Sequence, residues 1–321
     1  MTLSLPSAPA QVAGPPATRL PRRPVLTPAV PVLQRGPAVL QVGLEPTAVV
    51  VRHRAAATLL GALDGRHDLS ALRRLAAGSG MAPAEVDVVL RALHEAGLLA
   101  PPTSATGTAV RLVGLGPLGQ QVARLLLAAG LRVYAADDRP GPTRRRALRI
   151  TDLDDLPRLR SGGLTVVNHW SKPERVDLSL TVVATDAVEP DRLVTDALLR
   201  GDQPHLVLRA AGRSATVGPL VLPGRTACLR CTDLTRRDAD PDWPVLLGQL
   251  VALRLPTAAA LVAWAAGVGV AQVLAHLQGQ LPESAGATVE LSEHDHLMRW
   301  RAWPVHAGCG CAWAATTEWG P

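Results

Sequence analysis

The stretch AVRLVGLGPLGQQVARLLLAAGLRVYAADD, residues 109–138, decides the fold class of this chain. An apolar run is followed by the spacing G-x-G-x-x-G at Gly114, Gly116 and Gly119, a helical stretch, and a second apolar run that ends at Asp137. Glycines at this spacing allow a tight turn and a close backbone approach to a phosphate, which the free N–H groups of the next helix can bind. The order predicts a Rossmann-type βαβ unit.

The same motif marks a candidate nucleotide site. Asp137 lies 18 residues after Gly119. An acid about 20 residues after the glycine motif can bind a ribose hydroxyl. Asp186, at the end of the later apolar run LSLTVVATD, is a second acidic candidate. The fingerprint does not choose between NAD, FAD and ATP.

Four cysteines form two close pairs, Cys228-x-x-Cys231 and Cys309-x-Cys311. Four thiolates at these spacings can surround one tetrahedral ion, which predicts a closed, structural zinc site. Four unrelated thiols are one alternative. A redox C-x-x-C is another, and we disfavour it because we do not expect Cys228 to begin a helix after a thioredoxin-like strand. His306 is superfluous as a ligand, so we expect it to pack beside the site.

The region before the βαβ unit predicts a separate small domain at residues 34–101. Apolar runs at 39–42 and 48–51 predict a β-hairpin, and three helical stretches follow, ending near Gly97. Leu98–Ala100 could return as a short strand. This order indicates a winged-helix-like α+β arrangement. Residues 102–108 then form a linker, and residues 109–321 form the second domain.

Composition and charge narrow the partners and the compartment. The formal net charge is +6, but no basic stripe with interleaved aromatic residues is present, so nucleic acid is not expected. A solvated basic face or an acidic peptide partner remain the two interpretations. Residues 1–33 are rich in Pro and Ala and are predicted to be disordered. No export signal is visible, so we expect a cytoplasmic protein, in which cysteines favour metal binding over disulfides.

One apolar segment is long enough to cross a membrane, TAAALVAWAAGVGVAQVLA at residues 257–275. It consists mostly of Ala and Gly, which gain little from lipid, and it lies between the two cysteine motifs. We therefore predict a fully buried helix and no membrane contact. His294 and His296 could suggest a metal, but a short His/Asp cluster in a polar stretch is usually a surface loop. Trp300, Trp303 and Trp313 flank the second cysteine pair and are expected to pack around it.

These motifs, in this order, resemble the E1-like adenylyltransferases, which include ThiF, MoeB and ubiquitin-activating enzymes. The ending Trp303-Pro304-x-His306-x-x-Cys309-Gly310-Cys311 is more similar to the ocin-ThiF-like group, the C-type component of TOMM cyclodehydratases. The stretch from Leu59 to Leu99 resembles a PqqD-like RiPP recognition element. The resemblance implies an E1-like doubly wound sheet with a structural zinc site, preceded by a peptide-binding domain.

In such recognition elements the leader of a ribosomal precursor peptide adds a strand to the small sheet beside the third helix. Either the strand edge at 48–52 or that at 98–100 could accept it. Arg52, Arg54 and Arg91 could meet an acidic leader. The residues that the resemblance assigns to peptide binding are Val49, Val51, Arg52, Val86, Val89, Leu90 and Leu93.

The chain departs from active E1-like enzymes at the nucleotide site. It lacks the Asn-x-x-Arg-Gln segment after the ribose-binding acid, and the family's Asp-Asn appears as Asp186-Ala187. We therefore expect ATP binding to be weak or absent at a vestigial site formed by Gly114, Gly116, Gly119, Asp137 and Asp186. The resemblance implies a scaffold that is not catalytic alone and presents the peptide to a YcaO cyclodehydratase.

Two other functions stay open at this point. One is a working adenylyltransferase that activates a peptide carboxylate with ATP. The other is a nicotinamide or flavin reductase, which the late cysteine pair disfavours. A homodimer is a further arrangement that E1-like domains adopt.

Overall fold

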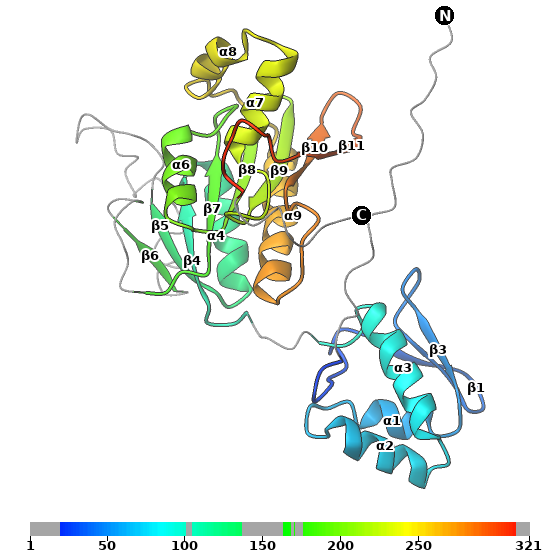
Figure 1. Ribbon diagram of the computed structural model, residues 1–321. Helices are drawn as coiled ribbons and strands as arrows, with labels where there is room; N and C mark the ends of the chain where they lie inside the picture. The colour runs from blue at the N-terminus through cyan, green and yellow to red at the C-terminus, as the bar shows by residue number, and fades with distance from the viewer. Residues whose placement is uncertain (1–19, 101–104, 137–162, 168–169, 171–175, 313–321) are drawn as a thin grey trace, which may run out of the picture. The chain divides into compact units, whose positions relative to one another are not determined.

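The computed structural model describes residues 20–100, 105–136, 163–167, 170 and 176–312. The chain divides into two compact units, unit 1 of Met1–Pro102 and unit 2 of Thr103–Pro321 (Figure 1). The division falls at the Pro-, Ser- and Thr-containing segment in which the sequence predicts a linker. Each unit has its own hydrophobic core.

Unit 1 combines an antiparallel sheet in the order β1-β2-β3 with helices that cover it. The predicted hairpin is confirmed, because Val39–Val42 pairs with Val49–Arg52 and Val42 lies opposite Val49. An Asp68 carboxylate caps the second helix by accepting from the Ala71 N–H at 2.7 Å. The described elements of unit 1 are β1 (Val32–Gly36), β2 (Val39–Val42), β3 (Val49–Arg52), α1 (Ala56–Gly61), α2 (Leu69–Gly78) and α3 (Pro83–Glu95).

The boundary of unit 1 corrects the sequence prediction. Residues 20–33, which we predicted to be disordered, belong to unit 1, and β1 begins before residue 34. Leu26 forms a bridge with Leu99, and the Ala100 N–H donates to the Val25 carbonyl at 2.7 Å. Leu20, Leu26 and Val30 pack against the core. The Pro-rich composition of this segment led to the prediction of disorder, although its few apolar residues pack in the core. Residues 98–100 pair with this segment and do not extend the hairpin.

Unit 2 is built on one mixed sheet, and the predicted doubly wound α/β sheet is confirmed. Within the described residues the strand order is β11-β10-β9-β8-β7-β4-β5-β6. The pairs from β6 to β8 are parallel, and those from β8 to β11 are antiparallel. The order of the parallel strands reverses between β4 and β7, which is where doubly wound sheets bind ligands at their carboxyl ends.

The elements of unit 2 follow in chain order. They are β4 (Ala109–Val113), α4 (Pro117–Ala128), β5 (Arg132–Ala136), β6 (Leu164–Val166), β7 (Leu180–Thr185), α6 (Arg192–Arg200), β8 (His205–Ala211), β9 (Ser214–Val221), α7 (Leu229–Ala239), α8 (Trp243–Leu250), α9 (Ala259–Leu277), β10 (Ala287–Ser292) and β11 (Met298–Ala302).

Helices cover both faces of this sheet because its central strands are apolar on both sides. Leu112, Val182 and Leu208 face α4 and α9 in the main core. Their chain neighbours, such as Val183 and Val207, point to the opposite face and meet α6 and the start of α7. Figure 1 shows the two helical layers on either side of the sheet. A run that is apolar at every position is typical of such doubly covered strands.

Helix α9 is the segment that the sequence marks as long enough to span a membrane. By length and composition it passes that test, and it is the one helix of the described residues that does. One face packs in the core through residues such as Leu261 and Val270. The prediction of a fully buried helix is wrong for the other face, where Ala263, Gly267 and Ala271 are exposed.

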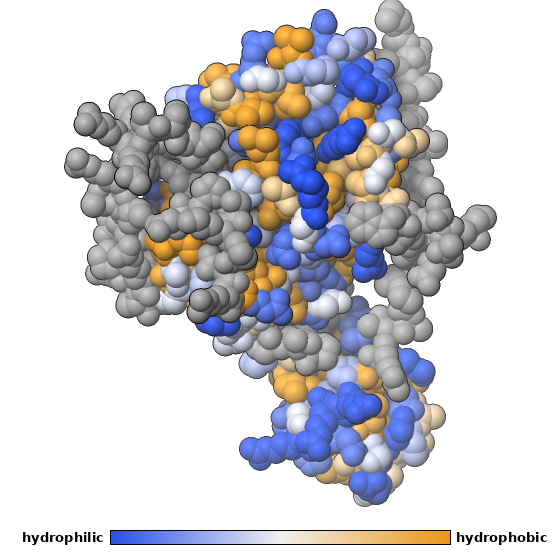
Figure 2. Space-filling model, turned by 60° about the vertical axis from the view of Figure 1, so that its left-hand side comes forward, coloured by the Kyte–Doolittle hydropathy of each residue, from blue (hydrophilic) through white to orange (hydrophobic). Residues whose placement is uncertain are grey.

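Helix α8 differs from the other helices of unit 2, since none of its residues is buried. Val245 and Leu246 are exposed, as are Leu253 and Leu255 just beyond it. Figure 2 shows apolar side chains gathered at the end of unit 2 where α8 lies. Exposed apolar area of this kind marks surfaces that contact other molecules.

Candidate metal centre and glycine-rich loop

The first cysteine pair is positioned by the start of α7. Cys228 is the N-cap residue of this helix in extended backbone geometry, and Cys231 lies in its first turn. Residues three apart on a helix share a face, so both thiols point the same way. The expectation that Cys228 does not begin a helix is therefore wrong, and the redox alternative must be judged on the position of the other cysteines.

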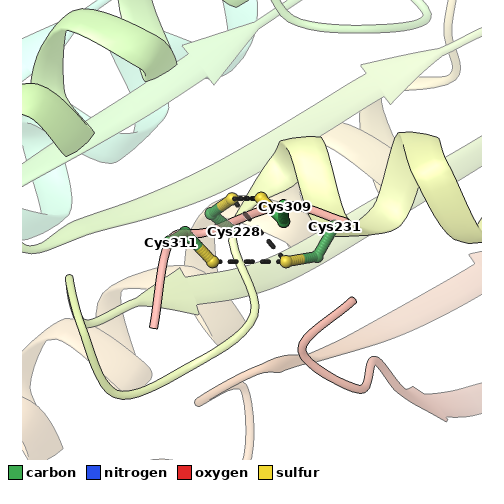
Figure 3. A group of neighbouring side chains, drawn as sticks. All are labelled: Cys228, Cys231, Cys309 and Cys311. Atoms are coloured by element: carbon green, nitrogen blue, oxygen red, sulfur yellow. Dashed lines mark hydrogen bonds between the residues drawn. The ribbon is translucent and has the colours of Figure 1, made fainter. Parts of the chain in front are cut away.

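The second pair closes on the first from the end of the chain. Gly310 separates Cys309 from Cys311 and has a φ of +72°, a conformation that L side chains rarely adopt. The sulfur–sulfur distances are 3.5 Å from Cys228 to Cys309, 3.3 Å from Cys231 to Cys311 and 3.9 Å from Cys228 to Cys231 (Figure 3). The prediction that these four residues meet is confirmed.

The geometry fits a tetrahedral ion. All four sulfur atoms lie within 4.8 Å of one another. Four thiolates at a Zn–S distance of about 2.3 Å would have their sulfurs about 3.8 Å apart. A disulfide needs about 2.05 Å, so no pair is bonded in this arrangement. A four-sulfur donor set with little solvent access suits zinc in a closed, structural role.

The thiols strongly influence one another's ionisation. Hydrogen bonding from Cys228 lowers the pKa of Cys231 to about 4, whereas the same bond raises the pKa of Cys228. Burial raises the pKa of Cys309 to about 12. A cation bound among the four sulfurs would offset the charge of several thiolates in so small a space, so the cluster is compatible with a bound metal ion.

Side chains around the cluster hold it in place. Trp303 packs against the cysteines and donates its indole N–H to Thr288 Oγ1 at 3.0 Å. His306 Nε2 lies 2.8 Å from Asp238 Oδ2, and His306 Nδ1 accepts from the Gly308 N–H at 3.0 Å. Its backbone N–H also hydrogen-bonds to the Cys231 sulfur. His306 therefore supports the site from outside, as predicted.

Other aromatic and histidine predictions near the cluster had mixed outcomes. Trp300 does not pack around the cysteines, because it lies on β11 with 57% of its surface exposed. Trp313 lies outside the described residues. His294 and His296 lie in the turn between β10 and β11, and neither joins a metal-binding group among the residues that the structure describes.

A cluster of ion pairs around the buried Glu189 lies beside α7, and sequence reasoning missed it. Glu189 is only 4% exposed and pairs with Arg192 at 2.9 Å, with Arg236 at 3.0 Å and with Arg209. Arg192 also pairs with Asp233 at 2.7 Å. No motif in the sequence marks Glu189, since its partners come from α6, β8 and α7.

Charge in this cluster decides the ionisation of Glu189. Burial would raise the pKa of Glu189, but the three arginines outweigh burial and lower it to about 2. Arg236 also stacks near the rings of Trp243, 4.6 Å away, and Trp303, 5.1 Å away. Helix α7 thus connects the cysteine cluster at its start to the loop that follows β7.

The glycine-rich loop lies at the switch point of the sheet. Gly114 has a φ of +105°, and a Cβ there would collide with the Ala184 carbonyl. A Cβ on Gly119 would collide with the Gly114 carbonyl, and one on Gly116 with the Asp186 carboxylate. The structure therefore brings these three glycines and Asp186 together, as predicted. Asp137 lies outside the described residues.

Asp186 itself makes a contact that bears on ligand binding. Its Oδ1 accepts from the Leu118 N–H at 3.2 Å, in the first turn of α4. The residue before it, Pro117, has no N–H to offer. A carboxylate of the chain therefore already interacts with the helix terminus that the motif predicts for a phosphate.

The residues predicted to bind a peptide divide into two groups. Val51, Val86, Leu90 and Leu93 are at most 4% exposed and form the core of unit 1, so they cannot contact a peptide. This corrects the prediction: apolar residues at helical spacing on α3 face inward. Val49 and Val89 are partly buried at the surface, and Arg52 is exposed at the end of β3. Arg91 is exposed on α3, and Arg54 fills the space beside Gly80.

Comparison with known proteins adds evidence on the fold. No family model matches the chain, and no curated protein matches it. Among solved structures, E. coli MccB with ATP has a TM-score of 0.60 at 15% identity, covering 90% of this chain and 99% of MccB. The microcin C7 biosynthetic enzyme MccB in complex with N-formylated MccA has a TM-score of 0.59 at 15% identity, covering 90% and 99%.

A third similar structure is a larger protein. A heterocyclase in complex with substrate and cofactor has a TM-score of 0.54 at 18% identity, and the match covers 90% of this chain but 39% of the heterocyclase. At these identities the similarity shows the fold alone. Fold and site together define an α/β protein with the fold of MccB, as the predicted E1-like fold class requires, and with a four-cysteine cluster that fits a metal ion.

Proposed function

We propose that this protein binds the leader of a ribosomal precursor peptide through unit 1 and presents the peptide to a partner enzyme that forms azolines. The observation that carries the proposal is the outer edge of β3. Within the described residues β3 pairs with β2 alone, so its other side is available for an added strand.

The structure favours this edge over the second candidate. The Leu98–Ala100 strand is occupied by the N-terminal segment, since the Thr27 N–H donates to the Leu98 carbonyl at 3.0 Å. A strand added beside β3 would meet Val49 and Val89 as an apolar floor. Arg52 would stand at one end to meet an acidic residue of the peptide.

Deletion of residues 1–101 tests the leader site. The shortened chain should lose binding of its cognate leader peptide in fluorescence polarisation. A milder variant, Arg52→Glu, should weaken binding of an acidic leader, and Arg66→Glu serves as a control elsewhere on unit 1. Unchanged affinity after the deletion would overturn the proposal.

We further propose that the four cysteines hold a structural zinc ion, which is not used in a reaction step. Cys228, Cys231, Cys309 and Cys311 would be its ligands, and the ion would supply folding energy by joining α7 to the end of the chain. Metal analysis of the purified protein should give one zinc per chain.

The nucleotide site is proposed to be vestigial. The Asp186 contact with Leu118 supports this view, because an anion of the chain competes with a phosphate for the α4 terminus. Ala187, where active relatives carry Asn, removes a polar neighbour. ATP should then bind weakly or not at all in isothermal titration calorimetry.

The chemistry is proposed to reside in a YcaO-type partner. The heterocyclase with this fold is a longer chain, and the present chain matches 39% of it. Helix α8 is the surface that we assign to this contact, since Val245 and Leu246 are exposed there. Val245→Asp should reduce co-elution of the partner, whereas Val88→Asp in unit 1 should not. A homodimer is the other assembly that we propose to test, by light scattering.

A second candidate function is a working adenylyltransferase. It is favoured by the match to MccB with ATP over 99% of that chain and by the position of Asp186 beside the glycine loop. Peptide-dependent exchange of pyrophosphate into ATP, abolished in Asp186→Asn, would establish it. Absence of exchange with leader-containing peptides would leave the scaffold function.

A further inference from the structure

The last strand of the unit 2 sheet is unusually open. All five residues of β11 are exposed, including Met298 at 68% and Trp300 at 57%. Among the described residues β11 pairs with β10 alone, so it forms one edge of the sheet. Figure 1 shows the β10–β11 hairpin at this edge. An edge strand presents unpaired N–H and C=O groups, and large exposed apolar side chains beside them can pack against an added strand.

The two faces of β11 differ in chemistry. Trp300 lies opposite Val289 and Met298 opposite Leu291, which gives one apolar face. The other face carries Arg299 opposite Glu290, and Arg301 opposite Thr288. Arg301 stacks over the Trp303 ring, with its guanidinium carbon 3.9 Å from the ring centroid.

The arginines also differ in their pairing. Arg299 interacts with the exposed carboxylate of Asp295, whereas Arg301 has no carboxylate partner among the described residues. A cation held by an aromatic ring and left without an acid is suited to an incoming carboxylate.

A second copy of the chain fits this edge poorly. In a symmetric antiparallel pair of two β11 strands, residues that lie directly opposite each other point to the same face of the sheet. The arginine face of one copy therefore lies beside the arginine face of the other. The register with full overlap then places Arg299 opposite Arg301, and a shift by two residues in either direction places Arg299 or Arg301 opposite itself. Like charges directly opposite are destabilising, so the edge is protected from self-pairing.

We propose that β11 is a second strand-binding edge, which takes an extended segment of another polypeptide with acidic side chains on one face and apolar side chains on the other. The backbone of β11 would supply the hydrogen bonds, Arg301 would select the acidic side chain, and Met298 with Trp300 would receive the apolar ones. This site is in unit 2 and does not depend on leader binding at β3.

A synthetic peptide with alternating Glu and Val, labelled with fluorescein, tests the proposal on the full chain. Binding should saturate in fluorescence polarisation, and the same peptide with Lys for Glu should bind at least about tenfold more weakly. Arg301→Glu should reverse this preference between the two peptides. Arg213→Glu, at an exposed site on the turn before β9, is the matched control and should leave the preference unchanged. Zinc content and unfolding midpoint identify any variant that fails to fold.

Hydrogen exchange gives a second measurement. Non-specific attraction between the peptide and basic side chains would not protect the backbone amides of β11. Alternate amides within residues 298–302 should gain protection when the Glu peptide is added. Protection confined to unit 1, or no saturable binding, would overturn the proposal. Self-association that Trp300→Thr abolishes would assign the edge to a second copy instead. Peptide binding that appears only in a chain ending at residue 312 would show that the chain's own last residues occupy this edge. Either of these two results would also overturn the proposal.

Discussion

The cysteine cluster of unit 2 and the β3–α3 face of unit 1, which comprises Val49, Arg52 and Val89, are proposed to bind a metal ion and a peptide, and they are built in two different ways. The cluster uses buried side chains from distant parts of the chain, and each of the four contributes one sulfur atom. The β3–α3 face uses backbone groups along an edge and side chains such as Val49 that are only partly buried. Substitutions should therefore act on stability at the cluster and on affinity at the face.

Loss of one cysteine should have the largest effect. Cys309→Ser removes one of four ligands, so zinc should be released and the cooperative unfolding of unit 2 should be lost, because metal binding and folding are coupled. Native mass spectrometry and calorimetry would measure both. Ala312→Ser, which adds a hydroxyl beside the same turn, is the control and should keep the ion. One zinc per chain in Cys309→Ser would contradict the metal assignment.

The Glu189 cluster should rank second. Glu189→Gln leaves one buried and two partly buried arginines short of a carboxylate and should lower the free energy of unfolding by about 3–5 kcal/mol. Urea denaturation would measure this. Glu293→Gln, at an exposed pair 3.7 Å from Arg213, should change it by less than about 0.5 kcal/mol.

The same residue sets a dependence on pH. The pKa of Glu189 is lowered to about 2 in the folded protein from an ordinary value of 4.5. A depressed folded pKa gives stability that is present above the unfolded pKa and is lost as pH falls from about 4.5 toward 2. Unfolding free energies measured across that window should fall less steeply in Glu189→Gln than in the native chain.

Unit 1 tests the distinction between core and contact on one helix. Leu90 is fully buried, so Leu90→Ala should destabilise unit 1 by about 2–5 kcal/mol. Val88 is 58% exposed on the same helix, and Val88→Ala should have an effect within about 0.5 kcal/mol. Equal effects of the two substitutions on the unfolding of unit 1 would contradict the inward orientation of Leu90.

The smallest effect should come from the histidine beside the cluster. His306→Ala removes the links to Asp238 and Gly308 while leaving every sulfur in place. Zinc affinity should fall by about tenfold, in the lower range for residues that support metal ligands. Competition with a chromogenic chelator would measure it, with His294→Ala as the control. An unchanged affinity would show that the backbone of residue 306 suffices.

These contrasts also explain what could be predicted from the sequence. Cysteines are rare in this chain, so their spacing indicates a shared site with little ambiguity. Glycine and acid positions in a βαβ pattern similarly place Gly114 and Asp186 at one edge. The sequence does not distinguish apolar residues of α3 that contact a peptide from those that form the core. The 3.6-residue period that predicts the helix is also the pattern of its buried face. Glu189 could not be found, since its environment is assembled by tertiary packing alone.

The segment before β1 has a practical consequence for dissecting the protein. A unit 1 excised at residue 34 would lose Val25, Leu26 and Thr27, and the backbone groups of Leu98–Ala100 would then lack their partners. Such a fragment would expose an artificial strand edge beside the true one at β3. Any peptide that it captured could be bound at a surface that the intact chain keeps covered. A fragment meant to report on leader recognition should therefore begin at or before Leu20.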